Sequence, residues 1–395
     1  MDEKLKQRLQ KHIEAQRSEE FTEVALHRNR SRVIDRINDS ISKNPRVVVT
    51  LGCSFAYGQG AYTQDTLDIV RPQGGKFSNF DYVYKEHDLK DLLDLCEQQK
   101  LWLNQKPETG NNLNNAEGDF EVITRPLETS NSYVNKVAEI LDYVPINLGN
   151  LGNGNLATTN RLFSYPIDWH KCEKIVVIWA YTDMNRYDVV NDGKNDYQYV
   201  GEDYKTMWPL MGDYDPSQEK FHQGSDWHNA QYFITKTAWS ELYSYIHFII
   251  SGNKINTWCK AHNAELITMG AFEHYSKETA ELAYTASRVH RDHNHQVTDL
   301  EFNLGNCLEY ASGHKEANQK ALEMFPWDSV WKPGGENTFF DLCLAQERNL
   351  KGLSMHDIVG SGGTPDDWVF PCGHPSGKSH ELLAQLLVND FKDRL

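Results

Sequence analysis

Four short apolar runs constrain the fold of this chain more than any other feature of its sequence. They cover residues 46–51, 144–148, 174–180 and 264–270, and most of their residues are aliphatic or β-branched. Runs of this length and composition are typical of buried parallel strands, which are covered on both faces. Segments with a helical period separate and follow them, at 131–142, 158–165, 239–262 and 378–394. The sequence therefore predicts an α/β fold, a parallel sheet with helices on both faces.

The remaining segments predict one α/β domain, 44–395, with additions. An N-terminal helical extension covers 1–43, and its second apolar stripe consists of Val33, Ile34, Ile37 and Ile41. These helices are a candidate surface for oligomer formation. Long, polar, irregular insertions are expected at about 61–130, 187–237 and 272–365, beside the core and not as separate domains.

Composition excludes several classes of protein. No apolar run approaches the ~18 residues that a membrane span needs, and the charged first 20 residues contain no secretory signal. Seven scattered cysteines without a C-x-x-C pair fit reduced thiols. With 40 basic and 56 acidic residues the formal charge is −16, which argues against nucleic-acid binding. We expect a cytoplasmic protein without a membrane span.

The first apolar run leads directly into Gly52-Cys53-Ser54-Phe55-Ala56-Tyr57-Gly58. A serine in the turn between a buried strand and a helix lies at the sheet edge, which suits a nucleophile. When the motif stands alone, an ordinary turn or a phosphate-binding loop is its commoner explanation. Cys53 is a rival nucleophile, but adjacent side chains diverge at such a turn, and we expect the Cys53 thiol to point into the core.

A second candidate lies just before the last helical segment, in Cys372-Gly373-His374-Pro375-Ser376. A histidine in a tight loop at the sheet edge can accept a serine proton at neutral pH. Taken alone, a histidine in such a position is more commonly a solvated loop residue.

Three segments together resemble the SGNH (GDSL-like) hydrolase family. GCSFAYG after the first run, NLGNLGNGN after the second and GHPSGKSHELLAQLL at the end are similar to that family's first, second and fifth blocks, in order and spacing. The resemblance covers about half of the chain. The variant motifs of this chain are similar to versions of the family in tailed phages and marine bacteria. The resemblance implies a flavodoxin-like sheet, with Ser54 as nucleophile, His374 as general base, and the N–H groups of Ser54 and Gly152 as oxyanion donors.

The third block departs from the family pattern. After 174–180 the family has Gly-x-Asn-Asp, whereas Asp183 falls where the oxyanion-binding Asn is expected, and a carboxylate cannot donate a hydrogen bond. Thr182 or Asn185 can supply the donor instead, and we favour Asn185. Arg186 is expected to form a surface ion pair with Asp188 or with a carboxylate of the insertion.

The fifth block departs as well. Pro371 occupies the family's acid position, three residues before His374. Asp366 or Asp367 could reach the imidazole instead, or a backbone carbonyl could orient it and leave a Ser-His dyad. Of these, Asp367 is our predicted third residue.

A histidine-rich stretch is the remaining candidate site. His290, Asp292, His293 and His295 could ligate a metal, with His356 and Asp357 completing the site. Only one segment of ligands is obvious, so a solvated loop is favoured, and we predict no metal and no cofactor.

Two functional hypotheses follow. The first is a serine hydrolase acting on an acyl ester of a small molecule or carbohydrate, because the aromatic-rich insertions could form a sugar-sized groove. The second is a binding or virion-associated structural module of the same fold, in which the missing acid and the altered third block reflect weakened chemistry.

Overall fold

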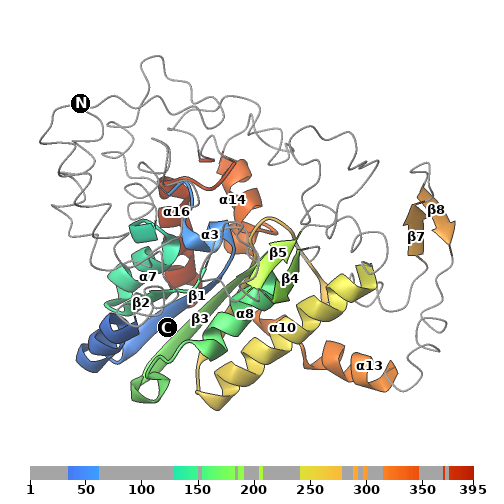
Figure 1. The fold of residues 1–395 in the computed structure, drawn as a ribbon. Coiled ribbons are helices and arrows are strands. Elements are labelled where there is room, and N and C mark those ends of the chain that lie inside the picture. Colours follow the sequence, from blue (N-terminus) through green and yellow to red (C-terminus); the bar gives the residue numbers. More distant parts are fainter. Residues whose placement is uncertain are drawn as a thin grey trace, which may run out of the picture.

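A four-stranded parallel sheet organises the part of the chain that the structure describes (Figure 1). Its strands are β1 (Arg46–Gly52), β2 (Val144–Asn147), β3 (Lys174–Tyr181) and β6 (Glu265–Gly270), in the order β2-β1-β3-β6. The structure is a computed structural model and describes residues 34–61, 129–149, 154–182, 186–190, 204–207, 241–277, 288–291, 297–300, 315–346, 368–369 and 373–395.

The predicted fold class is confirmed. The four apolar runs form the four strands, with ends that differ from the predicted ones by one residue at most. All three pairings in the sheet are parallel. The order 2-1-3-4 of the parallel strands is that of flavodoxin-like sheets, in which ligands bind beyond the carboxyl ends of the strands.

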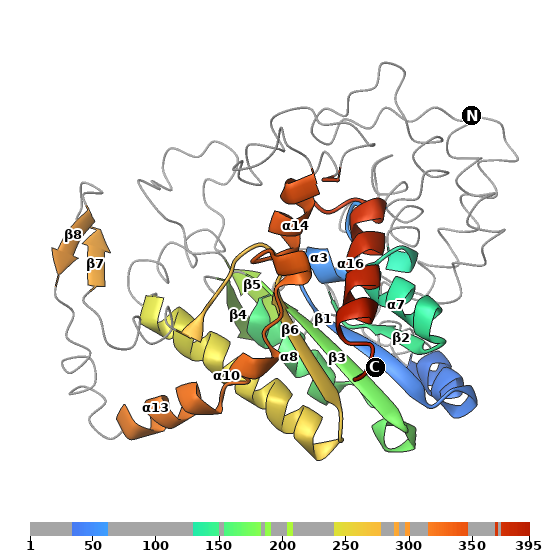
Figure 2. The same cartoon turned by 180° about the vertical axis from the view of Figure 1, so that it is seen from behind.

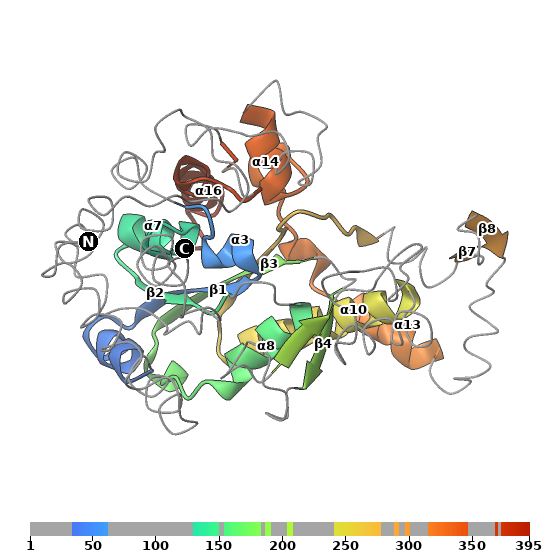
Figure 3. The same cartoon turned by 45° about the horizontal axis from the view of Figure 1, so that its top comes forward.

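One face of the sheet is covered by α8 (Asn155–Ser164), α10 (Glu241–Ala261) and a helix over 34–43 (Figure 3). Alternate residues of each strand point to this face, as the pleat requires. The resulting apolar cluster includes Val47, Val49, Leu51, Ile175, Val177, Trp179, Leu162, Phe248, Ile255 and Ile41. The expected apolar stripe of the lead-in helix therefore packs on the core at Ile34, Ile37 and Ile41, while residues 1–33 lie outside the described part.

The opposite face is covered by α7 (Tyr133–Leu141), α14 (Phe339–Gln346) and α16 (Gly377–Asp390), which lie in front of the sheet in Figure 2. The alternate strand residues point here and form a second cluster with Val48, Val176, Ile178, Ile267, Met269, Val134, Val137, Phe339, Leu383 and Leu387. Full burial of each aliphatic side chain contributes about 1.5 to 3 kcal/mol. The C-terminal helix is thus part of the core, which fixes the segment immediately before it.

Part of the third expected insertion extends the sheet. Val330 forms a parallel bridge with Thr268 of β6, and Thr338 forms another with Gly270. This segment lies at the fifth position of the flavodoxin-like order, between α13 (Lys315–Met324) and α14. The expectation of an irregular stretch across 272–365 is therefore wrong for 315–346. Pro333, Gly334 and Gly335 interrupt the segment, so it lacks the apolar run that marks the other strands.

Two antiparallel pairs lie in the expected insertions. They are β4 (Tyr187–Val190) with β5 (Tyr204–Met207), and β7 (Arg288–Arg291) with β8 (Val297–Leu300). Among the described residues no helix combines the length and the apolar character needed to cross a bilayer. The described cysteines Cys53, Cys172, Cys259 and Cys343 are free thiols.

Candidate functional site

Ser54 is the first residue of α3 (Ser54–Tyr57), a single turn of helix that is separated from the end of β1 by one residue, Cys53. The chain turns sharply here because Gly52 has a φ of +153° and lies against β3. Gly58 ends the turn with a φ of +102°, and its N–H donates to the Ser54 carbonyl at 3.0 Å. These two glycines place Ser54 at the carboxyl end of the sheet (Figures 1 and 3).

Replacing Gly52 by alanine is expected to lower the free energy of unfolding by about 3 kcal/mol. The added Cβ would lie 2.5 Å from the Ala180 carbonyl oxygen, which belongs to a central strand and cannot move aside. Gly335→Ala is the matched control, since Gly335 also has a positive φ, +86°, but its Cβ would meet nothing within 4 Å. Urea denaturation should show a clearly smaller loss for Gly335→Ala; equal losses would mean that the close packing on β3 is unimportant.

Cys53 and Ser54 point in different directions. Cys53 is fully buried in the cluster beneath α7 and α16, whereas Ser54 keeps 6 % of its surface exposed. The structure thus agrees with the expectation that the thiol of Cys53 lies in the core. Only the hydroxyl of Ser54 is available at the sheet edge.

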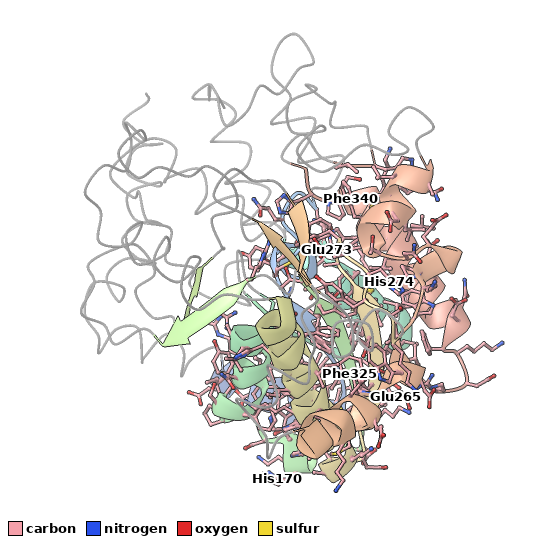
Figure 4. All side chains as sticks on the ribbon, turned by 90° about the vertical axis from the view of Figure 1, so that its right-hand side faces the viewer. His170, Glu265, Glu273, His274, Phe325 and Phe340 are labelled. Carbon is pink, nitrogen blue, oxygen red and sulfur yellow. The ribbon has the colours of Figure 1, made fainter. Side chains whose placement is uncertain are left out.

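His374 lies beside Ser54, although 320 residues separate them in the sequence. Its Nε2 is 2.8 Å from the Ser54 Oγ, within hydrogen-bond distance. The imidazole packs on Phe55, with 5.3 Å between ring centroids, and Phe55 is itself buried against Phe339 and Phe340 of α14. In Figure 4 Phe340 and Glu273 lie near the carboxyl end of β6, while Glu265 marks its start. The aromatic packing holds the imidazole over the serine turn at that edge of the sheet.

Asn147, the last residue of β2, ties the second block to the serine turn. Its side-chain amide donates to the carbonyls of Ala56 and Tyr57 at 3.2 and 3.1 Å, while its Oδ1 accepts the Gly149 N–H at 3.0 Å. A Cβ on Gly149 would lie 2.7 Å from the Tyr57 nitrogen. Glycine at 149 therefore permits the chain leading to 150–153 to lie directly against α3.

Asn155, the first residue of α8, forms two hydrogen bonds with the backbone of Thr182, the residue that follows β3. Its Nδ2 donates to the Thr182 carbonyl at 3.1 Å, and its Oδ1 accepts the Thr182 N–H at 3.0 Å. Both residues are buried. This paired contact fixes the backbone from which residues 183–185 depart.

Replacing Asn155 by alanine is expected to lower the free energy of unfolding by about 2 to 4 kcal/mol, because a buried donor and a buried acceptor both lose their partner. Asn256→Ala is the control, since Asn256 donates to the Met324 carbonyl at an exposed position. That change should stay within about 0.5 kcal/mol. Equal denaturation midpoints for the two variants would contradict the role of the Asn155 contact.

A second histidine, His380, is completely buried on α16. Its Nδ1 accepts the Tyr133 N–H at the start of α7 at 3.1 Å, so the neutral ring carries its proton on Nε2. Nothing among the described residues accepts a hydrogen bond from that Nε2. Burial, and secondarily the nearby His374, lowers the pKa of His380 to about 3, so this ring is neutral at physiological pH.

Arg186 is a correction to the sequence analysis. We expected a surface ion pair, but only 9 % of Arg186 is exposed, and its guanidinium lies over the Phe272 ring at 5.1 Å. Phe272 in turn packs on Phe55 at 5.4 Å. The arginine is therefore built into the aromatic packing next to His374.

Several predicted site residues lie outside the described part of the chain. They are Gly152, Asp183, Asn185, Asp366, Asp367 and Pro371. The same holds for His293 and His295, and only the backbone of His290 is described, in β7. Within the described ranges no group of three or more His, Cys, Asp or Glu could hold a metal ion.

The sequence analysis missed the two asparagines and His380. Asn147 and Asn155 lie in the Asn- and Gly-rich stretch that was considered for its glycine alone. A polar residue at the last position of a buried strand, as at Asn147, was the available signal. His380 gave none, because a histidine in an amphipathic helix does not reveal which face it occupies.

Comparisons with known proteins give little more. No family model matches the sequence, and no curated protein matches it either. One solved structure that is similar is that of a carbohydrate esterase whose active site has divergent catalytic and non-catalytic binding functions. The identity is 11 % and the TM-score 0.32, and the match covers 88 % of this chain and 65 % of the other, so the chain spans less than two thirds of that protein's length. Similarity at this level does not define a shared family or function.

Proposed function

We propose that this chain is a serine esterase of the SGNH type, with Ser54 as nucleophile and His374 as general base. The observation that carries the proposal is the 2.8 Å contact between the Ser54 Oγ and the His374 Nε2. A hydroxyl becomes a competent nucleophile when a base within about 2.6 to 3.2 Å accepts its proton. The contact lies at the carboxyl end of a flavodoxin-like sheet, the edge at which such folds bind their ligands.

The proposed reaction has two halves. In the first, the Ser54 Oγ forms a bond to the acyl carbon while its proton passes to His374. His374 then protonates the leaving alcohol oxygen as the ester C–O bond breaks. In the second, a water oxygen attacks the acyl carbon, gives its proton to His374, and releases the acid as Ser54 recovers the proton.

The oxyanion donors we propose are the N–H groups of Ser54 and Gly152 and the side chain of Asn185. The Ser54 N–H has no partner inside α3, since the first N–H groups of a helix never do. Asn147 and Asn155 support the other two donors indirectly, because they fix the backbone on either side of 150–153 and before 183–185. Each such donor is typically worth about 3 kcal/mol in the transition state.

The residue that orients His374 is proposed to be Asp367, with a backbone carbonyl as the alternative that would leave a dyad. In either case the partner accepts the Nδ1 proton and holds Nε2 toward the serine. The substrate we propose is an acyl ester, with O-acetyl groups on carbohydrates first among the candidates because of the aromatic-rich insertions.

An active-site serine probe tests the proposal. A fluorophosphonate should label the wild-type protein at Ser54, as mapped by peptide mass spectrometry, and should not label Ser54→Ala. Cys53→Ala is the matched control: it removes the neighbouring, fully buried nucleophile and should leave labelling intact. Absence of labelling in a folded wild-type protein would reject the esterase and favour the binding or virion-associated module.

A further inference from the structure

One carbonyl oxygen accepts two hydrogen bonds at the base of the loop that carries His374. The Trp368 carbonyl oxygen accepts the Ser376 N–H at 3.0 Å and the Ser379 hydroxyl at 2.5 Å. Next to this junction Val369 and Pro375 form an antiparallel bridge. His374 therefore lies on the second arm of a narrow loop whose base is fixed by a side chain of α16.

The anchor is buried and rigid. Ser376 and Ser379 are 2 % and 1 % exposed, and Val369 is 1 % exposed. Ser376 is the N-cap of α16 and Ser379 lies in its first turn, and Leu383 and Leu387 of the same helix are fully buried in the core beside the sheet. The hydrogen bond from the Ser379 hydroxyl to the Trp368 carbonyl therefore connects the loop to the buried part of α16.

Gly373 and Pro375 flank His374 on this arm. Gly373 has a φ of +81°, a conformation that bends the chain just before His374. Pro375 follows and has no N–H, so the residue next to His374 cannot donate to the opposite arm. At the base of this arm the Ser376 N–H and the Ser379 hydroxyl both donate to the Trp368 carbonyl.

We propose that Ser379 is a positioning residue for His374: through the Trp368 carbonyl its hydroxyl sets the loop so that the imidazole Nε2 stays at hydrogen-bond distance from the Ser54 Oγ. The same contact fixes the residue that directly follows Asp367 in the sequence. This inference rests on the proposed esterase function, in which the distance between the Ser54 Oγ and the His374 Nε2 matters for catalysis. The His374 side chain is half-buried, and its ring packs on Phe55.

Ser379→Ala tests the proposal in the full-length protein. We expect kcat/KM for an aryl acetate to fall about ten- to a hundredfold, since misplacing a reacting group by about 1 Å costs about a hundredfold. The pH midpoint of kcat/KM should shift as well, because the imidazole loses its fixed environment. Ser379→Thr keeps the hydroxyl and should recover most of the activity. If Ser379→Ala does not fold, Ser379→Cys takes its place.

Ser251→Ala is the matched control, since Ser251 on α10 is a fully buried serine on the other face of the sheet. It should leave kcat/KM and its pH midpoint unchanged. If Ser379→Ala matches Ser251→Ala in both, the positioning role is overturned and Ser379 serves only stability.

Chemical modification of His374 gives a readout that does not need hydrolysis. Diethylpyrocarbonate should modify His374 several-fold faster in Ser379→Ala than in the wild type, as measured by peptide mapping, with exposed His170 as internal reference. If His374 is modified faster in Ser379→Ala, but the wild type neither hydrolyses esters nor takes up the serine probe, the positioning role stands and the esterase is rejected. Unchanged modification together with unchanged kcat/KM would reject the positioning role alone.

Discussion

Alanine at Ser54, at His374 or at both positions is expected to lower kcat by the same factor, on the order of 10⁴ or more. In the proposed mechanism the two groups act as a unit, because an alkoxide forms only as the imidazole, 2.8 Å away, takes the proton. Once one of the two side chains is replaced, replacing the other should cause no further loss of kcat. The residual rate then comes from substrate binding and the oxyanion donors.

The measurement is kcat for an aryl acetate with the two single variants and the double variant, prepared without contact with the wild type. Cys53→Ala is the control for loss of a nucleophile at the neighbouring, buried position, and His170→Ala is the control for loss of a histidine at an exposed position. Losses that multiply in the double variant would contradict the shared role of Ser54 and His374. A single variant that retains wild-type kcat would do the same.

Acidification is expected to destabilise the protein through His380, by about 2 kcal/mol between about pH 7 and pH 5. Burial, with a smaller effect of His374, lowers the pKa of His380 in the folded protein to about 3, whereas an unfolded histidine titrates near its ordinary value of 6.5. The unfolded state therefore binds the proton first. The stability that the neutral ring contributes is complete above pH 6.5 and is lost progressively as the pH falls toward 3.

Urea denaturation at a series of pH values, with wild type and His380→Gln, measures this effect. Glutamine can accept the Tyr133 N–H but does not titrate, so the variant should lose about 2 kcal/mol less than the wild type over the same interval. His170→Gln, at an exposed position, controls for the substitution itself. Parallel pH curves for wild type and His380→Gln would show that His380 does not account for the acid sensitivity.

The sequence was sufficient for the sheet, because burial on both faces leaves a local signature. Runs such as 46–51 and 174–180 contain little but aliphatic and β-branched residues, and they became β1 and β3. The segment from Val330 to Thr338 has no such run, since it pairs with β6 at only two points and Pro333 and two glycines interrupt it. Its place at the edge of the sheet follows from the packing of α13 and α14, which no local pattern encodes.

The candidate site also contains residues that the sequence predicted and contacts that it did not. That Ser54 and His374 meet was expected from the resemblance of their motifs to the first and fifth blocks of the SGNH hydrolase family. Contacts between a side chain and a distant backbone group, such as those of Asn155 with Thr182, have no period in the sequence. Arg186 was misplaced for a related reason: its charge indicated the surface, whereas the Phe272 ring lets the guanidinium be buried.

The contact between Ser54 and His374 spans 320 positions of the chain and depends on its last helix. Ser54 is positioned by the packing of Gly52 on β3, whereas His374 is positioned by the segment that leads into α16. Partial opening of that one helix would separate the two groups while leaving every strand pairing intact. The proposed esterase activity would therefore depend on the docking of α16 and would be lost before the sheet itself unfolds.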